Sequence, residues 1–282
     1  MKYLILGGTG TLGRALTAEL LKHGDTKSIV CFSRDELKQK ETEAFFKSKK
    51  LSFRIGDIRD SGAVGCAMTG VDAVFHVSAL KHVDTIEANP EESVKTNVLG
   101  TMNVANAAIS LGVPQVVFSS TDKAVAPVNV YGMCKGISER ILLGHNKTQT
   151  RTKFSVYRWG NVAGSRGAAP HYFAKTLQEE KRAYVTDAEM TRFWIRIEDA
   201  VKFMITTYQE SDGIMVPPMK SSKVTDMVEA IARLKGVSEY ETKIVGLRPG
   251  EKIHESILPD LHSSDGPFYT VPELMELVGP SL

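Results

Sequence analysis

The chain has 282 residues, of which 42% are hydrophobic and 24% charged, with a formal net charge of +2, a composition typical of a globular protein with a full core. The two signs of charge are mixed along the sequence, and no stretch reaches the ~20 apolar residues of a membrane span, which argues against nucleic acid or a membrane as a partner. Cys31, Cys66 and Cys134 have neither the spacing of a zinc site nor the even number of a disulfide framework, so we expect a cytoplasmic protein without a bound metal.

The first 160 residues alternate short apolar runs with longer stretches of helical period. We expect strands at 3–6, 29–32, 53–55, 73–77, 116–119 and 154–157, separated by helices at 12–23, 35–48, 60–69, 91–111 and 130–145. Runs such as LIL, AVF and VVF are apolar at every position, which is typical of parallel strands covered by helices on both faces. The pattern predicts an α/β fold with a Rossmann-type doubly wound parallel sheet.

Residues 161–282 are less regular. A loop-like GNVAGSRGAAP leads to helices near 170–180, 198–210 and 224–235, a strand at 184–186, an apolar IMVPP, an isolated strand KIVGL and a polar tail. We predict a smaller C-terminal mixed α/β lobe that binds the substrate and packs directly on residues 1–160, with some elements crossing back to the sheet. Residues 1–160 are expected to carry the cofactor and the catalytic residues.

A glycine-rich segment follows the first expected strand and opens the first helix. Its members are Gly7, Thr9, Gly10, Thr11, Leu12 and Gly13. Backbone N–H groups and the positive end of a helix are suited to a dinucleotide diphosphate. The GxxGxxG spacing is the short-chain dehydrogenase variant of the dinucleotide fingerprint. A plain tight turn is the alternative, which the flanking strand and helix disfavour.

The residues at the end of the second expected strand indicate whether the cofactor is NADP or NAD. The segment consists of Ser33, Arg34, Asp35, Glu36, Leu37 and Lys38. Ser33, Arg34 and Lys38 are suited to a 2′-phosphate, which predicts NADP. Alternatively, Asp35 binds the ribose of NAD, although it is equally well placed to cap the following helix. After the third strand, Asp57 and Ile58 are expected near the adenine.

Tyr131 and Lys135 lie four residues apart on an expected helix, so their side chains share one face. A nearby ammonium and the charge of a nicotinamide would lower the pKa of Tyr131 and make it the base for an alcohol. Thr121, Asp122 and Lys123 follow a central strand, at the edge where open α/β sheets bind ligands. The alternatives are a solvated helix pair and a surface salt bridge.

Most of the sequence resembles the bacterial UDP-N-acetylglucosamine 4,6-dehydratases that invert C5, extended short-chain dehydrogenases of pseudaminic acid and capsular sugar pathways. The resemblance runs from Met1 to about Pro259 and rests on the segments GGTGTLG, SRDELKQ, ALKHVDTIEANPEESVKTNVLGTMNV, SSTDKAVAPVNVYGMCK, YRWGNVAGSRG, MTRFWI and LRPGEKIHE. Where the family usually has HAAALKHV, this chain has HVSALKHV.

The resemblance implies a role for each catalytic residue. Tyr131, helped by Lys135 and Thr121, would remove the C4 hydroxyl proton while hydride passes from C4 to NADP⁺. Lys123 would then abstract the C5 proton, and Asp122 would protonate the departing C6 hydroxyl. Hydride would return to C6, and protonation of C5 from the opposite face would invert that centre. Lys123 and Tyr131 are the two residues that favour inversion over retention.

The resemblance also implies binding residues and partners. The cofactor would be contacted further by Ser78, Ala79, Lys81 and Asn97. The UDP-sugar substrate would be contacted by Lys81, Asn161, Val162, Ala163, Gly164, Ser165, Arg166, Met190, Arg192, Arg248 and Glu251. Relatives commonly pair through helices near 91–111 and 130–145, so we expect a homodimer or a higher homo-oligomer, up to a hexamer.

Two other functions compete with dehydration. A sugar-nucleotide 4-epimerase or ketoreductase would use Tyr131 and Lys135 and leave Lys123 without a chemical role. A protein that binds NADP without turnover would have no use for the polar residues at the strand end.

Overall fold

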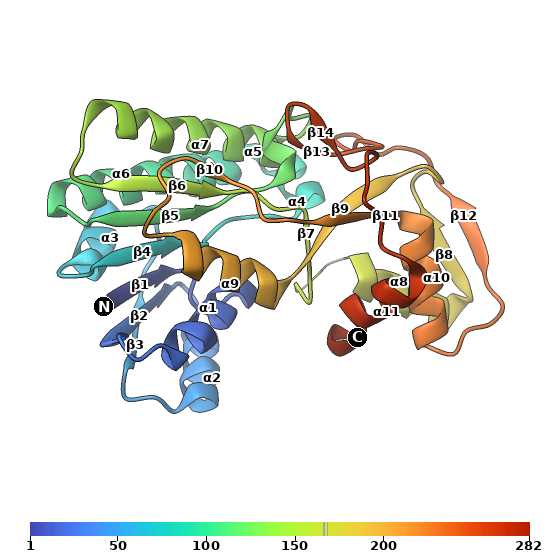
Figure 1. Cartoon of the computed structure of the whole chain (residues 1–282), viewed down its shortest axis with the longest axis horizontal. Helices are drawn as coiled ribbons and strands as arrows, with labels where there is room; N and C mark the ends of the chain where they lie inside the picture. The colour runs from blue at the N-terminus through green and yellow to red at the C-terminus, as the bar shows by residue number, and fades with distance from the viewer. Residues whose placement is uncertain (166, 168) are drawn as a thin grey trace.

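The computed structural model describes residues 1–165, 167 and 169–282. Its larger part is a seven-stranded sheet in the order β10-β6-β5-β4-β1-β2-β3, in which every neighbouring pair is parallel (Figure 1). The strands are β1 (Lys2–Leu6), β2 (Ser28–Ser33), β3 (Leu51–Ile55), β4 (Ala73–His76), β5 (Gln115–Ser119), β6 (Lys153–Tyr157) and β10 (Ile214–Met215). The predicted doubly wound parallel sheet is confirmed.

Helices cover both faces of this sheet, as the unbroken apolar runs predicted. They are α1 (Thr11–Lys22), α2 (Glu36–Phe46), α3 (Ser61–Met68), α6 (Gly100–Leu111), α7 (Val130–Thr148) and α9 (Ile197–Thr207). Successive strand residues face opposite sides, so Leu4 packs in one core with residues of α3 and α6. Its neighbour Ile5 packs in a second core with residues of α1 and α9.

The helix predicted over 91–111 is not continuous. The structure has α5 (Pro90–Ser93), a π-helical segment η1 (Val94–Leu99) and then α6, preceded by a short α4 (Val83–Ala88) that the sequence did not predict. The π-helical segment contains the buried Asn97, whose side chain bonds both backbone groups of Leu80 at 2.9 Å. The π-helical segment therefore coincides with the residue whose side chain binds the backbone of Leu80.

The smaller part lies beside the sheet and away from the N-terminus (Figure 1). It has a three-stranded sheet of β7 (Asn161–Ala163), β9 (Thr191–Arg196) and β11 (Lys220–Lys223), a parallel pair of β8 (Arg182–Val185) and β12 (Glu241–Ile244), and a hairpin of β13 (Ser256–Leu258) and β14 (Leu261–His262). Its helices are α8 (Ala169–Glu180), α10 (Val224–Leu234), α11 (Val271–Val278) and the short η3 (Gly279–Ser281). Because α9 and β10 return to the main sheet, neither part is one continuous stretch of sequence.

Three expectations for this half are wrong. The KIVGL strand is not isolated, because β12 pairs with β8, and the loop-like GNVAGSRGAAP contains β7. The tail is not merely polar. Thr270 and Glu273 form a capping box at the start of α11, which buries Leu274, Leu277 and Val278.

Side-chain contacts to backbone carbonyls join the two parts. Asn129 Nδ2 donates to the Gly250 carbonyl at 2.8 Å, and Lys252 Nζ donates to the Val125 carbonyl at 2.8 Å. Arg158 Nη1 donates to the Ile257 carbonyl at 3.2 Å. Residues 250–257 are thereby held at the carboxyl edge of the sheet, next to the short 3₁₀ helix η2 (Asp122–Ala124).

Candidate active site

The glycine-rich segment predicted to bind the diphosphate requires glycine at two positions. Gly7 has φ +86°, and a Cβ on it would lie 2.9 Å from the backbone nitrogen of Ser78. A Cβ on Gly13 would lie 2.3 Å from the Gly7 carbonyl oxygen. The α1 N-cap is Gly10, which has no side chain to cap the helix. The segment, which includes Thr9, Thr11 and Leu12, therefore fits a dinucleotide diphosphate at the start of α1.

The Asp35 side chain is engaged at the start of α2. It caps α2 by accepting the Lys38 N–H at 3.0 Å, and Lys38 Nζ lies 2.9 Å from its other oxygen. These backbone and side-chain bonds lower the pKa of Asp35. Arg34 has a half-exposed side chain that lies 3.7 Å from Asp57. This arrangement leaves Arg34 open to a ligand while Asp35 has the capping role.

The neighbouring predicted residues have different surroundings. The Ser33 hydroxyl accepts from Gln39 Nε2 at 3.0 Å, whereas Glu36 and Leu37 lie exposed in the first turn of α2. Ile58 is buried in the core, where a Cβ on Gly100 would come within 2.8 Å of it. The side chain of Ile58 therefore packs under α6.

The loop after β4 is fixed by Asn97. Both polar atoms of its amide are engaged by Leu80, so Asn97 positions the loop that contains Ser78, Ala79 and Lys81. Lys81 Nζ donates to Ser165 Oγ at 2.7 Å. This bond connects the predicted cofactor loop with the predicted substrate segment.

Four of the predicted catalytic residues meet at the carboxyl end of β5. Thr121 Oγ1 donates to Asp122 Oδ1 at 2.9 Å, and Lys123 Nζ lies 3.0 Å from the same oxygen. Tyr131, from the first turn of α7, is hydrogen bonded to the Thr121 side chain. Asp122 is fully buried, and its Oδ2 has no hydrogen-bond partner among the described residues. A buried acid, an amine and a phenol are thus gathered in one place.

The pKa of Tyr131 differs from the expectation. Burial raises it to about 12 and Asp122 adds to the rise, whereas Lys123 and the bond with Thr121 lower it. The expected lowering is therefore wrong for the chain's own residues, because burial outweighs the cation. Burial lowers the pKa of Lys123, but Asp122 and Glu255 more than offset this, so that its net shift is upward and the amine is an ammonium near neutral pH.

Lys135 contacts β5. Its Nζ donates to the Ser119 carbonyl and lies 3.8 Å from the centre of the Phe118 ring. Burial lowers the pKa of Lys135 to about 7. The cation that lowers the pKa of Tyr131 is Lys123.

Sequence reasoning missed the partner of Lys123 in the smaller part. Glu255 is 2% exposed, with Oε1 at 3.3 Å from Lys123 Nζ and Oε2 at 3.5 Å from Lys252 Nζ. Glu255 is the last residue of the segment LRPGEKIHE, but its position in the sequence gives no indication of its contact with Lys123. A second missed group is the buried pair of Glu139 and Arg158, 2.6 Å apart, in which Glu139 also accepts from Ser120.

The predicted substrate residues divide into two groups. Arg192 is buried and its guanidinium donates to the carbonyls of Thr191, Lys252 and Ile253, so it braces the segment before Glu255. Glu251 accepts from Thr186 Oγ1 at 3.2 Å and from the Arg248 N–H at 3.3 Å.

The remaining substrate residues lie on or near the small sheet. Asn161, Val162 and Ala163 form β7, Gly164 and Ser165 follow it, Met190 is buried before β9, Arg248 is exposed, and Arg166 lies outside the described residues.

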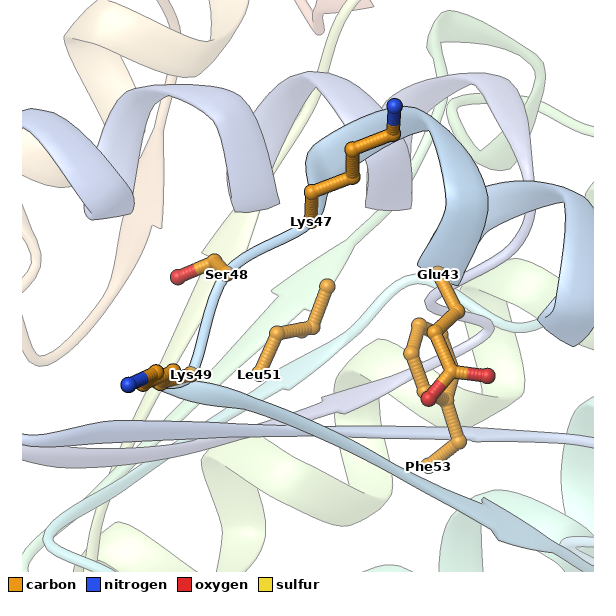
Figure 2. A pocket seen from close by; sticks show the side chains of 6 residues that line it. All are labelled: Glu43, Lys47, Ser48, Lys49, Leu51 and Phe53. Carbon is orange, nitrogen blue, oxygen red and sulfur yellow. The ribbon is translucent and has the colours of Figure 1, made fainter.

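A surface pocket lies elsewhere on the molecule. Figure 2 shows its lining residues, which run from Glu43 of α2 through the following turn to Phe53 of β3. This turn enters β3 at the amino edge of the sheet, opposite the edge that carries Asp122. No helix among the described residues is long and apolar enough to cross a membrane. Within the same residues, no three His, Cys, Asp or Glu side chains gather in a way suited to a metal ion.

Known proteins resemble this chain over most of its length. A family model described as polysaccharide biosynthesis protein matches residues 3–270. The chain is 42% identical over 260 residues to a UDP-N-acetylglucosamine 4,6-dehydratase (inverting) of Campylobacter jejuni, covering 90% of this chain and 76% of that protein. It is 36% identical over 280 residues to a UDP-glucose 4-epimerase of Rickettsia felis, covering 95% and 82%.

A solved structure is similar throughout. The X-ray structure of Pen from Bacillus thuringiensis has a TM-score of 0.91 and 32% identity, covering 100% of this chain and 98% of that one. The chain therefore belongs to the polysaccharide biosynthesis protein family, where its relatives include the inverting UDP-N-acetylglucosamine 4,6-dehydratases that its sequence resembles.

Proposed function

We propose that the chain is a sugar-nucleotide 4,6-dehydratase that converts UDP-N-acetylglucosamine to a UDP-2-acetamido-2,6-dideoxy-4-keto-hexose with inversion at C5. The observation that carries this proposal is the contact of the buried Asp122 with the partly buried Lys123, 3.0 Å apart beside Tyr131. Removal of water needs a further acid and base close together, whereas oxidation at C4 alone needs only one base, for the hydroxyl proton. The relationship to the Campylobacter jejuni dehydratase supports the same reaction.

We propose NADP as the cofactor. The nicotinamide supplies an acceptor for the hydride from C4 and a donor for its return to C6. The glycines from Gly7 to Gly13 would hold the diphosphate, and Ser33, Arg34 and Lys38 the 2′-phosphate. The half-exposed Arg34 and the engagement of Asp35 in the α2 cap support NADP over NAD.

Tyr131 would accept the proton of the C4 hydroxyl. The charge of Lys123 favours the phenolate against burial, and Lys135 lies one helical turn away on the same face of α7. The resulting ketone acidifies the C5 proton, which prepares the sugar for elimination.

Asp122 and Lys123 would perform the elimination. A proton that moves from the Lys123 ammonium to Asp122 across their 3.0 Å contact produces a neutral amine and a carboxylic acid. The amine takes the C5 proton, the acid gives its proton to the leaving C6 hydroxyl, and the two groups return to the ion pair. Hydride then returns to C6, and a proton taken up from solvent on the opposite face of C5 inverts that centre.

A 4-epimerase is the second candidate, favoured by 36% identity to the Rickettsia felis UDP-glucose 4-epimerase. That reaction would use Tyr131 and Lys135 and give Lys123 no proton to transfer. The placement of a partly buried lysine between two buried carboxylates disfavours this candidate, because such a cluster is costly to assemble without a use.

The variant Lys123→Ala separates the two functions. We expect it to bind NADP as the wild type does, measured by titration calorimetry, and to lose dehydration by about 10²-fold or more. Lys40→Ala, which removes an exposed lysine of α2, is the matched control and should keep full activity. Unchanged turnover of Lys123→Ala would contradict dehydration and favour epimerisation.

We also propose that the protein forms a homodimer through η1, α6 and α7. Leu99, Met102, Met133 and Ile137 are large apolar residues of these helices, and each is between 38% and 48% exposed. Such a surface supports pairing of two copies.

A further inference from the structure

We propose that Glu255 is the positioning residue of Lys123, holding the amine in place and stabilising the ammonium that forms when Lys123 takes the C5 proton. This assignment rests on the proposed function. Glu255 comes from the smaller part of the molecule, so the base would depend on a residue outside the sheet that carries it.

The geometry gives Lys123 two anchors. Its Nζ lies 3.0 Å from Asp122 Oδ1 and 3.3 Å from Glu255 Oε1. A lysine amine sits on four rotatable bonds, so a single anchor leaves its direction loosely defined. Asp122 must also give a proton to the leaving hydroxyl. Glu255 is therefore the carboxylate that can keep its contact with the amine throughout the elimination.

Glu255 itself is rigidly supported. Its N–H donates to Ser263 Oγ at 2.9 Å, and its carbonyl accepts from the Ser263 N–H at 2.8 Å. Arg192 donates to the carbonyls of Lys252 and Ile253, three and two residues before Glu255, at 2.9 and 3.0 Å. The backbone that carries Glu255 is therefore fixed from two sides, as a positioning role requires.

The charges around Lys123 give the two carboxylates different roles. Asp122, Glu255, Arg192 and Tyr131 all face or interact with its amine. Glu255 has a second cation, Lys252, at 3.5 Å, whereas the one ion pair of Asp122 within the described residues is with Lys123. The second cation stabilises Glu255 as a carboxylate. Asp122 is then the group that takes up and releases the proton. Glu255 stays ionised beside Lys123, as the aspartate beside the catalytic histidine does in a Ser-His-Asp triad.

The test is Glu255→Gln, which keeps size and hydrogen-bonding capacity while removing the charge. With UDP-N-acetylglucosamine and NADP⁺ in D₂O, two quantities are followed: the absorbance of the reduced nicotinamide and deuterium exchange at C5. We expect C5 exchange to fall on the order of 10- to 100-fold while oxidation at C4 continues, so that reduced cofactor accumulates. A purely structural defect would lower both.

The pH dependence gives a second readout. Glu255 is one of two carboxylates that raise the pKa of Lys123, so its neutralisation lowers that pKa. The rise of C5 exchange with pH should then move to lower pH, while its maximal value falls. Glu255→Asp keeps the charge, so it should lose less exchange and show a smaller pH displacement.

The matched control is Asp260→Asn, which neutralises an exposed carboxylate in the turn between β13 and β14 and should behave as the wild type. Equal losses of oxidation and exchange in Glu255→Gln, or exchange at the wild-type rate, would overturn the assignment. A wild-type protein that gives neither reduced cofactor nor exchange would overturn the proposed function itself, and the role of Glu255 with it.

Discussion

Lys135 has a buried amine that destabilises the fold. The residue is 3% exposed, and its Nζ donates to the Ser119 carbonyl and lies over the face of the Phe118 ring. Burial lowers the pKa of Lys135 to about 7, although Glu139 partly opposes this. In the unfolded chain the amine returns to its ordinary pKa of 10.5. Folding therefore favours the neutral amine.

Lys135→Met should stabilise the protein. The penalty for the charged amine is complete below the folded pKa of about 7 and disappears as the pH rises to 10.5. We expect the variant to be more stable than the wild type by about 2 to 4 kcal/mol near pH 6, and by much less near pH 10. Urea unfolding at both pH values measures the difference. A difference that does not change with pH would contradict this explanation.

Local spacing predicts only part of the site. Tyr131 and Lys135 follow from their position on one helix, and Asp122 and Lys123 from their place after a central strand. The contact of Lys135 with Ser119 depends on side-chain packing, which spacing does not determine. Glu255 approaches Lys123 only through the tertiary fold, so no sequence pattern could connect the two residues.

The helix α7 carries several residues of the site on one face. Asn129 caps it by accepting the Gly132 N–H at 2.7 Å, and a Cβ on Gly132 would lie 2.1 Å from the Lys123 carbonyl. The missing side chain lets α7 pack closely on η2, which brings Tyr131 to Thr121. Glu139, two turns further along the same face, forms the buried pair with Arg158.

Removing one member of that pair should be costly. Arg158→Met leaves Glu139 buried without its cation, and we expect a loss of about 3 to 5 kcal/mol in the free energy of unfolding. The double variant Arg158→Met with Glu139→Met replaces the pair by apolar groups and should recover most of this loss. Chemical unfolding of the single and double variants measures the coupling. Equal destabilisation of both would show that the pair has no special role.

The errors in element assignment have separate physical causes. The helix α11 was hidden in a tail that looked polar, although Thr270 and Glu273 have the spacing of a capping box. The strand β12 is exposed along its length and is defined by pairing with β8. Short strands that depend on a distant partner leave little periodicity in the sequence.

The whole molecule assembles its site from both parts. The larger part supplies Asp122, Lys123 and the glycine-rich segment, while residues 250–257 supply Glu255. These residues are bound to the larger part through contacts of Asn129, Lys252 and Arg158. The doubly wound sheet was predictable because its apolar runs are local and continuous. The junction was not, because its bonds join side chains to backbone carbonyls of remote segments.

Turnover of UDP-N-acetylglucosamine in D₂O, followed by NMR, tests the central claim most directly. The account predicts a 6-deoxy-4-keto product that carries deuterium at C5 and has inverted configuration there, with NADP⁺ regenerated. A product epimerised at C4 that keeps its C5 proton and its C6 hydroxyl would contradict it.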